Sequence, residues 1–355
     1  DPKSIVAQPL KRTGVTDKAN VHIRIKDMDS GRYWDGNSFE TAETDIETSY
    51  DDTLTTVDWS TATAINPALR DGKNYKTYLI PKDRAQNREA DYNYMPQYEV
   101  VFDTSLPKSY LASPTTYQIL RNISEIKGTA SDPAGSNAPN YNSDLSRNEL
   151  QIYYEQADKW WYDSQGKFSV DGSSFNIVTG TSVWKYSHTA LAGALTSGKY
   201  YILQSRALDR AGNTQAGFEI PASSRAFIWD KDAPVSGIIA PIAGGNYKPG
   251  GLTGSTALNG TASDPALPFV TEQLKKVQLN LGYLDGDTTY YWTGSAFSSY
   301  TVTETTAWQG TSLSGSAPVW DWDYMTDIAW KPEDREYKLE SKAMDDSRLS
   351  DDTGD

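Results

Sequence analysis

Cysteine is absent from all 355 residues of the chain. Its absence excludes disulfides, thiolate metal sites and cysteine nucleophiles. Histidine is nearly absent as well, and His22 and His188 lie too far apart to have the spacing of a metal-binding pair. The sequence holds no recurring serine, histidine and aspartate constellation and no glycine-rich phosphate loop. Carboxylates are numerous, but a catalytic pair of carboxylates in a glycosidase needs a cleft, which β-sandwich repeats rarely supply. We therefore expect a protein that is not an enzyme.

The chain also lacks positive charge and long apolar runs. Its 33 lysines and arginines stand against 47 acidic residues, and the formal net charge is −14 with no basic cluster. Phosphate backbones and anionic lipids repel such a chain, so we expect no nucleic-acid binding. No apolar run is long enough to span a bilayer, so no membrane insertion is expected. The chain opens on Asp1-Pro2 instead of methionine, which favours a processed protein or an excised piece.

Aromatic residues, in contrast, are abundant. The chain has 11 Trp and 23 Tyr, together with much Thr, Ser and Gly. These residues favour strands and turns, and no run of helix-forming residues reaches helical length. Modest aliphatic content beside many large rings indicates thin cores between facing sheets. We predict an all-β chain of two or three sandwich domains, each of roughly 100 to 150 residues.

The sequence repeats itself. A segment bounded by two prolines seven positions apart occurs at residues 2–9, 107–114 and 234–241. The hexapeptide Gly-Thr-Ala-Ser-Asp-Pro at residues 128–133 returns unchanged at residues 260–265. Self-similarity of this kind is the signature of a tandem array. The proline segments are interpreted as linkers, and the predicted domains are residues 1–105, 106–232 and 233–355.

Further elements recur in step with these linkers. Alternating apolar residues predict a strand at residues 21–25, 150–154 and 277–281. A strand-starting tyrosine lies at positions 75, 201 and 337, and an aspartate follows eight residues later, at positions 83, 209 and 345. In the first two repeats an apolar strand then ends in aspartate, at residues 100–103 and 227–230. Each unit thus has the size and turn spacing of one β-sandwich.

These residues resemble the bacterial immunoglobulin-like tandem repeats of large surface and adhesin proteins. That family combines a Gly-Thr-Ala-Ser-Asp strand, an Asp-x-Ala-Gly-Asn turn, a Phe-containing last strand and an Asp-x-x-x-Pro junction. Repeat two carries all four, at residues 128–132, at residues 209–213, at Phe227, and from Asp230 to Pro234. The resemblance implies immunoglobulin-like sandwiches arranged as a rod. It also implies an extracellular, cell-surface location and a role as spacer, stalk or adhesin.

Two repeats depart from the pattern. Repeat one has too few residues between Pro9 and Val21 for the Gly-Thr-Ala-Ser-Asp strand, and repeat three ends before a Phe-containing last strand. A sandwich that lacks a strand exposes unpaired backbone groups. Truncation explains both gaps. Alternatively, a strand from another copy of the chain or from an adjoining repeat completes the sandwich, and the contact builds a head-to-tail fibre.

Acidic residues at the predicted junctions are the candidate metal ligands. Asp103 precedes Pro107, and Asp230 and Asp232 precede Pro234 at the equivalent place. Hard carboxylate oxygens there could bind Ca²⁺ and stiffen the joint between domains. Aspartate is also favoured in turns because its side chain bonds nearby backbone groups. Both interpretations stay open, and Ca²⁺ is the one cofactor that the sequence suggests.

Four tryptophans near predicted hairpin tips suggest a second ligand class. Trp34, Trp160, Trp161 and Trp292 could stack on sugar rings, although core or hairpin packing would also place them at matching repeat positions and is the favoured interpretation. The leading hypothesis is a non-enzymatic extracellular structural protein, which forms a stalk, adhesin shaft or fibre and contacts other copies of itself or adjoining repeats. The alternative is a carbohydrate-binding surface adhesin that holds glycans on these rings.

Overall fold

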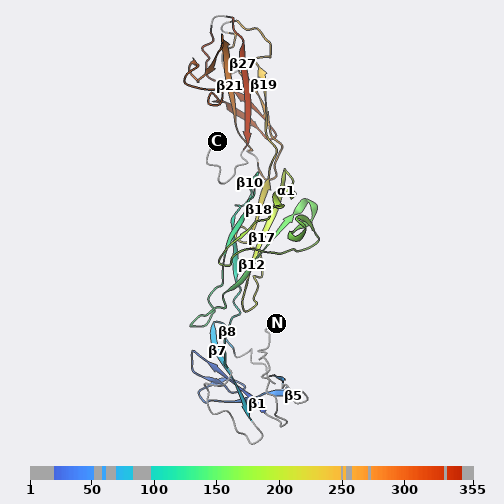
Figure 1. Ribbon diagram of the computed structural model, residues 1–355, viewed down its shortest axis with the longest axis vertical. Coiled ribbons are helices and arrows are strands. Elements are labelled where there is room, and N and C mark those ends of the chain that lie inside the picture. Colours follow the sequence, from blue (N-terminus) through green and yellow to red (C-terminus); the bar gives the residue numbers. More distant parts are fainter. Residues whose placement is uncertain are drawn as a thin grey trace.

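The computed structural model describes residues 20–51, 58–60, 69–82, 97–248, 251–252, 258–270, 273–331 and 334–345. Its strands form three groups placed end to end along one axis (Figure 1), which we call domain 1 (β1–β8), domain 2 (β9–β18) and domain 3 (β19–β27). The predicted all-β fold with tandem immunoglobulin-like domains is confirmed. The domain boundaries stay predictions, and the linker at residues 2–9 and Asp83 lie outside the described residues. No helix among the described residues is long and apolar enough to cross a membrane.

Domain 1 is built around a six-stranded sheet. Its order is β3-β2-β1-β7-β8, β4 also pairs with β1, and a separate ladder joins β5 to β6. The core on this sheet consists of Ile23, Ile25, Trp34, Tyr75 and Leu79. The strand bounds are β1 (Asn20–Asp27), β2 (Tyr33–Trp34), β3 (Phe39–Glu40), β4 (Ile46–Glu47), β5 (Ser49–Asp51), β6 (Asp58–Ser60), β7 (Lys73–Lys82) and β8 (Gln97–Phe102).

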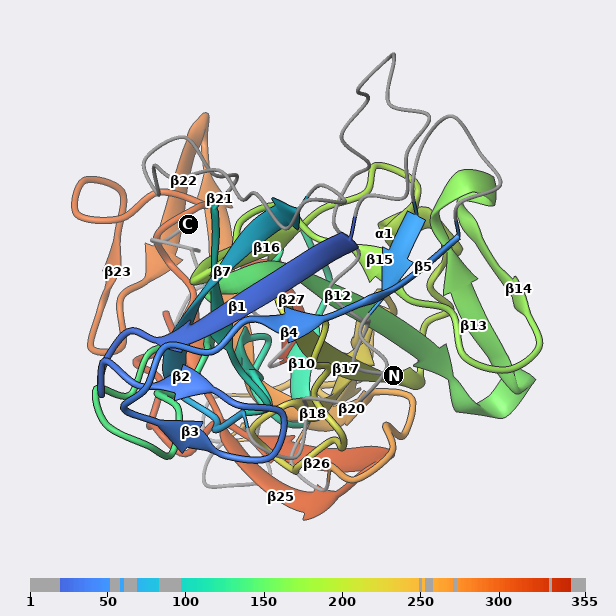
Figure 2. The same ribbon diagram turned by 90° about the horizontal axis from the view of Figure 1, so that it is seen from below.

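Domain 2 is a sandwich of two sheets. One has the order β10-β18-β17-β12-β13-β14 with β15 paired to β12, and the other has the order β16-β11-β9. Alternation along β11 and β17 buries every second side chain between the sheets. Seen along the long axis, the β13–β14 hairpin projects sideways from the rod (Figure 2). The bounds are β9 (Lys108–Ser113), β10 (Gln118–Leu120), β11 (Ile126–Ser131), β12 (Leu145–Tyr154), η2 (Glu155–Ala157), β13 (Lys159–Tyr162), η3 (Asp163–Gln165), β14 (Lys167–Val170), β15 (Asn176–Ile177), β16 (Val183–Tyr186), α1 (Leu191–Ala194), β17 (Lys199–Asp209) and β18 (Ser224–Trp229).

Domain 3 reuses this plan. One sheet has the order β19-β20-β26-β25, and the other has the order β23-β22-β21-β24 with β27 paired to β21. The register of β21 with β27 shifts by one residue near its start, as does that of β12 with β17. The bounds are β19 (Val235–Ala240), β20 (Asn259–Ser263), β21 (Leu274–Asp285), β22 (Thr288–Trp292), β23 (Phe297–Ser298), β24 (Gln309–Gly310), β25 (Ser312–Ser316), β26 (Val319–Asp323) and β27 (Tyr337–Asp345).

The glycine of the repeated hexapeptide has a packing role. A Cβ on Gly128 would lie 2.1 Å from the buried ring of Trp184, and one on Gly260 would lie 2.6 Å from the ring of Trp322. Backbone oxygens of the neighbouring strand are equally close, so neither position can accept a side chain. Each hexapeptide therefore starts within an interior strand of the smaller sheet, and its aspartate follows that strand at the domain junction.

Candidate metal centres

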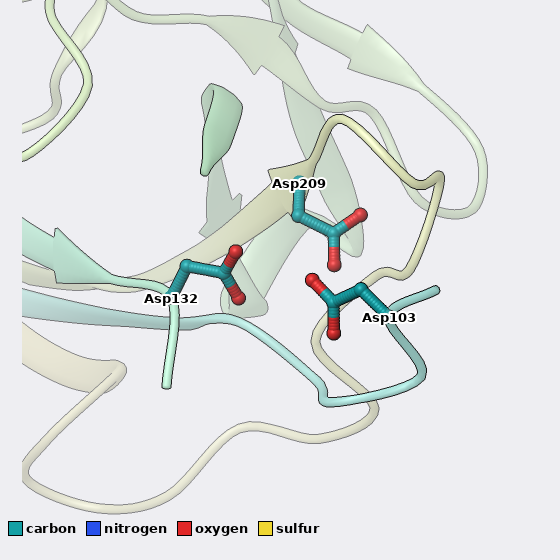
Figure 3. A group of neighbouring side chains, drawn as sticks. All are labelled: Asp103, Asp132 and Asp209. Carbon is teal, nitrogen blue, oxygen red and sulfur yellow. The ribbon is translucent and has the colours of Figure 1, made fainter. Parts of the chain in front are cut away.

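Three aspartates meet at each junction between domains. Asp103, Asp132 and Asp209 form the 1/2 triad, in which each offers a carboxylate oxygen within 4.8 Å of the others. Figure 3 shows their carboxylates pointing toward one another from separate segments. The 2/3 triad meets the same distance criterion and consists of Asp230, Asp264 and Asp345.

The two triads occupy equivalent positions in the repeats. The first member follows the last strand of the preceding domain, and the second follows the Gly-Thr-Ala-Ser strand of the next domain. The third ends the long strand β17 or β27. Each triad therefore joins one carboxylate from the domain below to two from the domain above.

In the 1/2 triad, the Asp-Arg-Ala-Gly-Asn turn folds around the carboxylate of Asp209. The backbone N–H groups of Gly212 and Asn213 donate to Asp209 Oδ1 at 2.8 Å. The Asn213 side-chain amide donates to Asp209 Oδ2 at 2.8 Å and to the backbone oxygen of Asp103 at 3.0 Å. Gly212 has φ +97°, a backbone conformation that would be strained for a residue with a side chain. The turn thus fixes one ligand and ties it to the preceding domain.

Asp103 is held just as firmly. It is 6% exposed, and its Oδ1 and Oδ2 accept hydrogen bonds from the backbone N–H groups of Ser105 at 2.9 Å and Ser143 at 2.8 Å. A carboxylate oxygen has two lone pairs, so one acceptor site on each oxygen remains for a cation. These bonds orient the carboxylate without using up its capacity to coordinate.

In the 2/3 triad, a role in a turn does not explain why an aspartate is buried at position 264. Its side chain is 1% exposed, and neither carboxylate oxygen has a hydrogen-bond partner among the described residues. Burial, together with the charges of Asp230 and Asp345, raises the pKa of Asp264 to about 7. A buried carboxylate without a partner is costly, and native structures provide either a bond or an ion for such a group. The arrangement suits a bound cation.

Asp132 repeats this pattern in the 1/2 triad. Both of its oxygens are buried, and neither has a hydrogen-bond partner in the part of the chain that the structure describes. Burial and the charges of Asp103, Asp209 and Asp144 raise the pKa of Asp132 to about 6. In both triads, therefore, the aspartate of the repeated hexapeptide is the unsatisfied member.

The donor set fits a hard divalent cation. Ca²⁺ takes six to eight oxygen ligands from carboxylates, carbonyls and water, whereas softer metals prefer sulfur or imidazole. Three convergent carboxylates would supply the charged part of such a shell and would neutralise a dication. The residues that would hold it are Asp103, Asp132 and Asp209 at one junction and Asp230, Asp264 and Asp345 at the other.

Two of the three aspartates predicted from the sequence lie in these triads. Asp103 and Asp230 each contribute one member, whereas Asp232 is exposed and its backbone N–H donates to Asp230 Oδ1 at 3.1 Å. Sequence reasoning did not assign Asp132, Asp209, Asp264 or Asp345 as ligands. Their signal was nevertheless present, because each recurs at a fixed place in the repeat.

The four candidate tryptophans lie mostly in the cores. Trp34, Trp161 and Trp292 are 4%, 0% and 1% exposed, so they offer no ring face to a sugar, contrary to the exposure that glycan binding requires. Trp160, on the β13–β14 hairpin, is half-buried, and the centre of its ring lies 4.6 Å from that of Tyr153. The matching repeat positions of the first three rings reflect core packing.

Comparison with known proteins adds a likeness of fold. No family model matches the chain, and no curated protein matches it. Among solved structures, the chain is similar to fibronectin(III)-like modules of Clostridium thermocellum CbhA, with 13% identity over 61% of this chain and 82% of that one and a TM-score of 0.27. It is also similar to a 1.5-MDa bacterial ice-binding adhesin, with 9% identity, coverage of 93% and 87% and a TM-score of 0.29. A tetra-tandem repeat from the extending region of a large adhesion protein shows 11% identity, coverage of 94% and 68% and a TM-score of 0.26.

Proposed function

We propose that this chain is a non-enzymatic, extracellular structural protein, a length of surface stalk, adhesin shaft or fibre whose junctions are stiffened by Ca²⁺. The single observation that carries the proposal is Asp264, which is buried at the 2/3 junction beside two further carboxylates and has no hydrogen-bond partner among the described residues. A structural load borne by a row of domains requires joints that resist bending, and a cation shared between domains supplies that resistance.

A bound cation would stiffen each junction because each triad combines aspartates from two domains. At the 2/3 junction, Asp230 belongs to domain 2, whereas Asp264 and Asp345 belong to domain 3. With a cation between them, the three carboxylates pull the two domains into one orientation. Without it, like charges held within 4.8 Å repel one another and favour separation. The same protein would thus be a stiff rod with Ca²⁺ and a jointed chain in chelator.

An extracellular location suits this chemistry. Sites on extracellular modules typically bind Ca²⁺ with dissociation constants of about 10⁻⁴ to 10⁻³ M, because calcium is plentiful outside cells. The net charge of −14 would also keep neighbouring rods apart in solution. End-to-end assembly by strand complementation between copies belongs to the same proposal. The carbohydrate-binding alternative retains only Trp160 of its four residues as a partly accessible ring.

Thermal unfolding with Ca²⁺ and with EDTA tests the proposal. At a free Ca²⁺ concentration 100-fold above the dissociation constant, binding adds about 2.7 kcal/mol to the stability of the folded state. For domains of this size, that gain raises the unfolding midpoint by roughly 10 °C. Asp232→Asn, which lies outside both triads, should keep the full gain. Superimposable melting curves in the two buffers would refute the cation site.

A further inference from the structure

The outer face of the smaller sheet in domain 2 is basic. This sheet has the order β16-β11-β9, and alternation along its strands leaves every second side chain on the face turned away from the core. The lysines at these outward positions are Lys108, Lys127 and Lys185. Lys127 and Lys185 lie opposite each other on β11 and β16, and Glu125 forms an ion pair with each, at 3.1 Å and 3.0 Å. Three lysines against one glutamate give this face a net charge of +2.

The same face of domain 3 is acidic. Its smaller sheet has the order β19-β20-β26-β25, and the charged residues at the outward positions of these four strands are Asp321 and Asp323. Trp184 and Trp322 mark equivalent places in the two domains, because each indole N–H donates to the backbone oxygen of the threonine in the hexapeptide at 3.2 Å. The residue that follows is Lys185 in domain 2 and Asp323 in domain 3. Equivalent surfaces of neighbouring domains thus carry opposite charge.

Each face also has a row of exposed apolar side chains beside its charges. In domain 2 the row consists of Val183 and Tyr110, which lie on either side of β11. In domain 3 it consists of Val319 and Val235, which lie on either side of β20. Complementary charges select a partner and its register, whereas buried apolar area provides affinity. Each of the two faces offers what the other needs in a partner.

The order of charged and apolar rows fixes how two rods can lie together. Strand β11 runs from Lys127 toward Asp132 at the 1/2 junction, with its apolar row nearer that junction. Strand β20 runs toward Asp264 at the 2/3 junction, and Asp321 lies opposite an earlier residue of β20 than Val319 does. In both domains, therefore, the charged row lies farther than the apolar row from the junction with the preceding domain. The rows of two copies coincide when the copies are parallel.

Domains 2 and 3 of one chain are placed end to end, so their outer faces cannot meet each other within that chain (Figure 1). We propose that domain 2 of one copy binds domain 3 of a second copy through these outer faces, with the two rods parallel and staggered by one domain. The lysine row then faces the two aspartates, and the two apolar rows pack together. Each copy keeps one face free for a further copy, so the assembly grows sideways without closing.

The net charge of −14 is compatible with this contact. At physiological ionic strength, charges more than about 8 Å apart are largely screened, so the signs of the facing side chains decide. Repulsion between the acidic remainders of two rods instead disfavours other side-by-side contacts. The contact extends the structural role proposed above to lateral assembly, and it requires neither the cation sites nor contact between chain ends.

Sedimentation velocity of the full chain over a range of concentrations tests the contact. We expect reversible self-association that weakens as salt is raised, because the charged rows are exposed. Lys185→Glu should weaken association by about tenfold or more. Lys167→Glu changes the net charge equally but lies on β14, outside the face, so it should leave association unchanged. A single monomeric species at every concentration would overturn the proposal, as would equal losses in the two variants.

An exchange of charges distinguishes a lost contact from a damaged fold. One variant carries Lys127→Glu and Lys185→Glu, and the other carries Asp321→Lys and Asp323→Lys. Alone, each variant should remain monomeric, since its two faces then have the same sign. Mixed together, the variants should associate again, because every face of one meets the opposite charge on the other. A mixture that stays monomeric would contradict the contact.

Single cysteines report the orientation, since the chain has none of its own. In an oxidised mixture, Val183→Cys should form a disulfide with Val319→Cys and not with Asp323→Cys. The reverse preference would mean that the rods are antiparallel, contrary to the proposal. Sedimentation and melting curves in Ca²⁺ and in EDTA separate the two proposals. Association without a Ca²⁺ effect on melting contradicts only the cation sites, and a Ca²⁺ effect without association contradicts only the lateral contact.

Discussion

The two junctions carry equivalent aspartate triads but differ in their other contacts. At the 1/2 junction, Asp71 of domain 1 accepts hydrogen bonds from the backbone N–H of Ser136 at 2.6 Å and that of Thr104 at 2.8 Å. The Ser105 hydroxyl also donates to it, at 3.0 Å. The backbone N–H of Tyr141 donates to the oxygen of Gly72 at 3.1 Å. Domain 2 is thus bonded directly to the β7 turn of domain 1.

The 2/3 junction has a serine, Ser197, where the 1/2 junction has Asp71. Its hydroxyl lies 3.4 Å from Asp230 Oδ1 and accepts from the Lys231 backbone N–H at 2.8 Å. The contact between domains here is aromatic: the ring of Phe269 lies 4.9 Å from that of Tyr117 and 5.0 Å from that of Tyr200. An aromatic contact is less directional than a set of charge-assisted hydrogen bonds.

This difference separates two ways of fixing an angle between domains. The 1/2 junction has hydrogen bonds that hold it whether or not a cation is bound, so Ca²⁺ adds to an existing clamp. The 2/3 junction has no such clamp among the described residues, so it depends more on its triad. We therefore expect chelation to loosen the 2/3 junction more than the 1/2 junction. Because the chain has no cysteine, pairs of introduced cysteines can be spin-labelled across either junction without background.

The largest effect is expected from Gly135→Ala, which should break the clamp of the 1/2 junction. A Cβ at this position would lie 2.2 Å from Gly72 Cα and 2.7 Å from the backbone oxygen of Tyr141. Both contacts are with backbone atoms, so relieving them would require a shift of the main chain. We expect a loss of about 2–4 kcal/mol in the docking of domain 2 on domain 1. Spin-label distances across this junction should broaden in Ca²⁺ and in EDTA alike.

Gly217→Ala is the matched control, because nothing lies within 4 Å of the Cβ it would add. The distances across the 2/3 junction should stay unchanged in both variants. A narrow distance distribution across the 1/2 junction in Gly135→Ala would show that the clamp is not what holds the domains.

The effect of Asp264→Asn on the stability of domain 3 should change sign with the buffer. In EDTA, the variant removes a buried carboxylate that has no partner, so domain 3 should become more stable. In Ca²⁺, it removes a ligand, and most of the cation-dependent gain of about 2.7 kcal/mol should disappear. Calorimetry in the two buffers measures both effects.

Asp132→Asn is the counterpart at the 1/2 junction. It should show the same signs in calorimetry, but the clamp around Asp71 should keep the spin-label distances there narrow. If Asp264→Asn lowered stability equally in EDTA and in Ca²⁺, the carboxylate would have a structural partner and the cation site would be wrong.

Much of this architecture could be predicted from the repeats. The recurring prolines, the hexapeptide and the alternating strands gave the all-β tandem fold, and Asp103 and Asp230 pointed to the junctions. The complete triads could not be read from local context, because Asp132 and Asp209 approach Asp103 only through the fold of the sandwich. Their recurrence at fixed repeat positions was the available signal, since a packing or turn role alone does not bring three carboxylates together.

The clamp was harder to predict. Asp71 and Ser136 are 65 residues apart, and the equivalent of Asp71 in repeat two is Ser197, so no repeated pattern marked the contact.

The smallest effect is expected from pH in the absence of a divalent cation. The pKa of Asp264 is raised to about 7 and that of Asp132 to about 6, above the ordinary value of about 3.9 that holds in the unfolded chain. The folded protein therefore binds more protons than the unfolded chain between pH 4 and 7, so stability in EDTA should rise as the pH falls from 8 to 5.

The pKa of Asp71 is shifted in the opposite direction, below its ordinary value. Burial would raise its pKa, but hydrogen bonds from Thr104 and Ser136 outweigh burial and lower it to about 2. Its contribution to stability is complete above pH 4 and is lost only as the pH falls through 2. In EDTA, lowering the pH from 8 to 6 should therefore narrow the spin-label distances across the 2/3 junction and leave the 1/2 junction nearly unchanged. In Ca²⁺ the sign should reverse, because protons compete with the cation for Asp264. Equal responses of the two junctions would mean that their aspartates, not the clamp, set the angle at both.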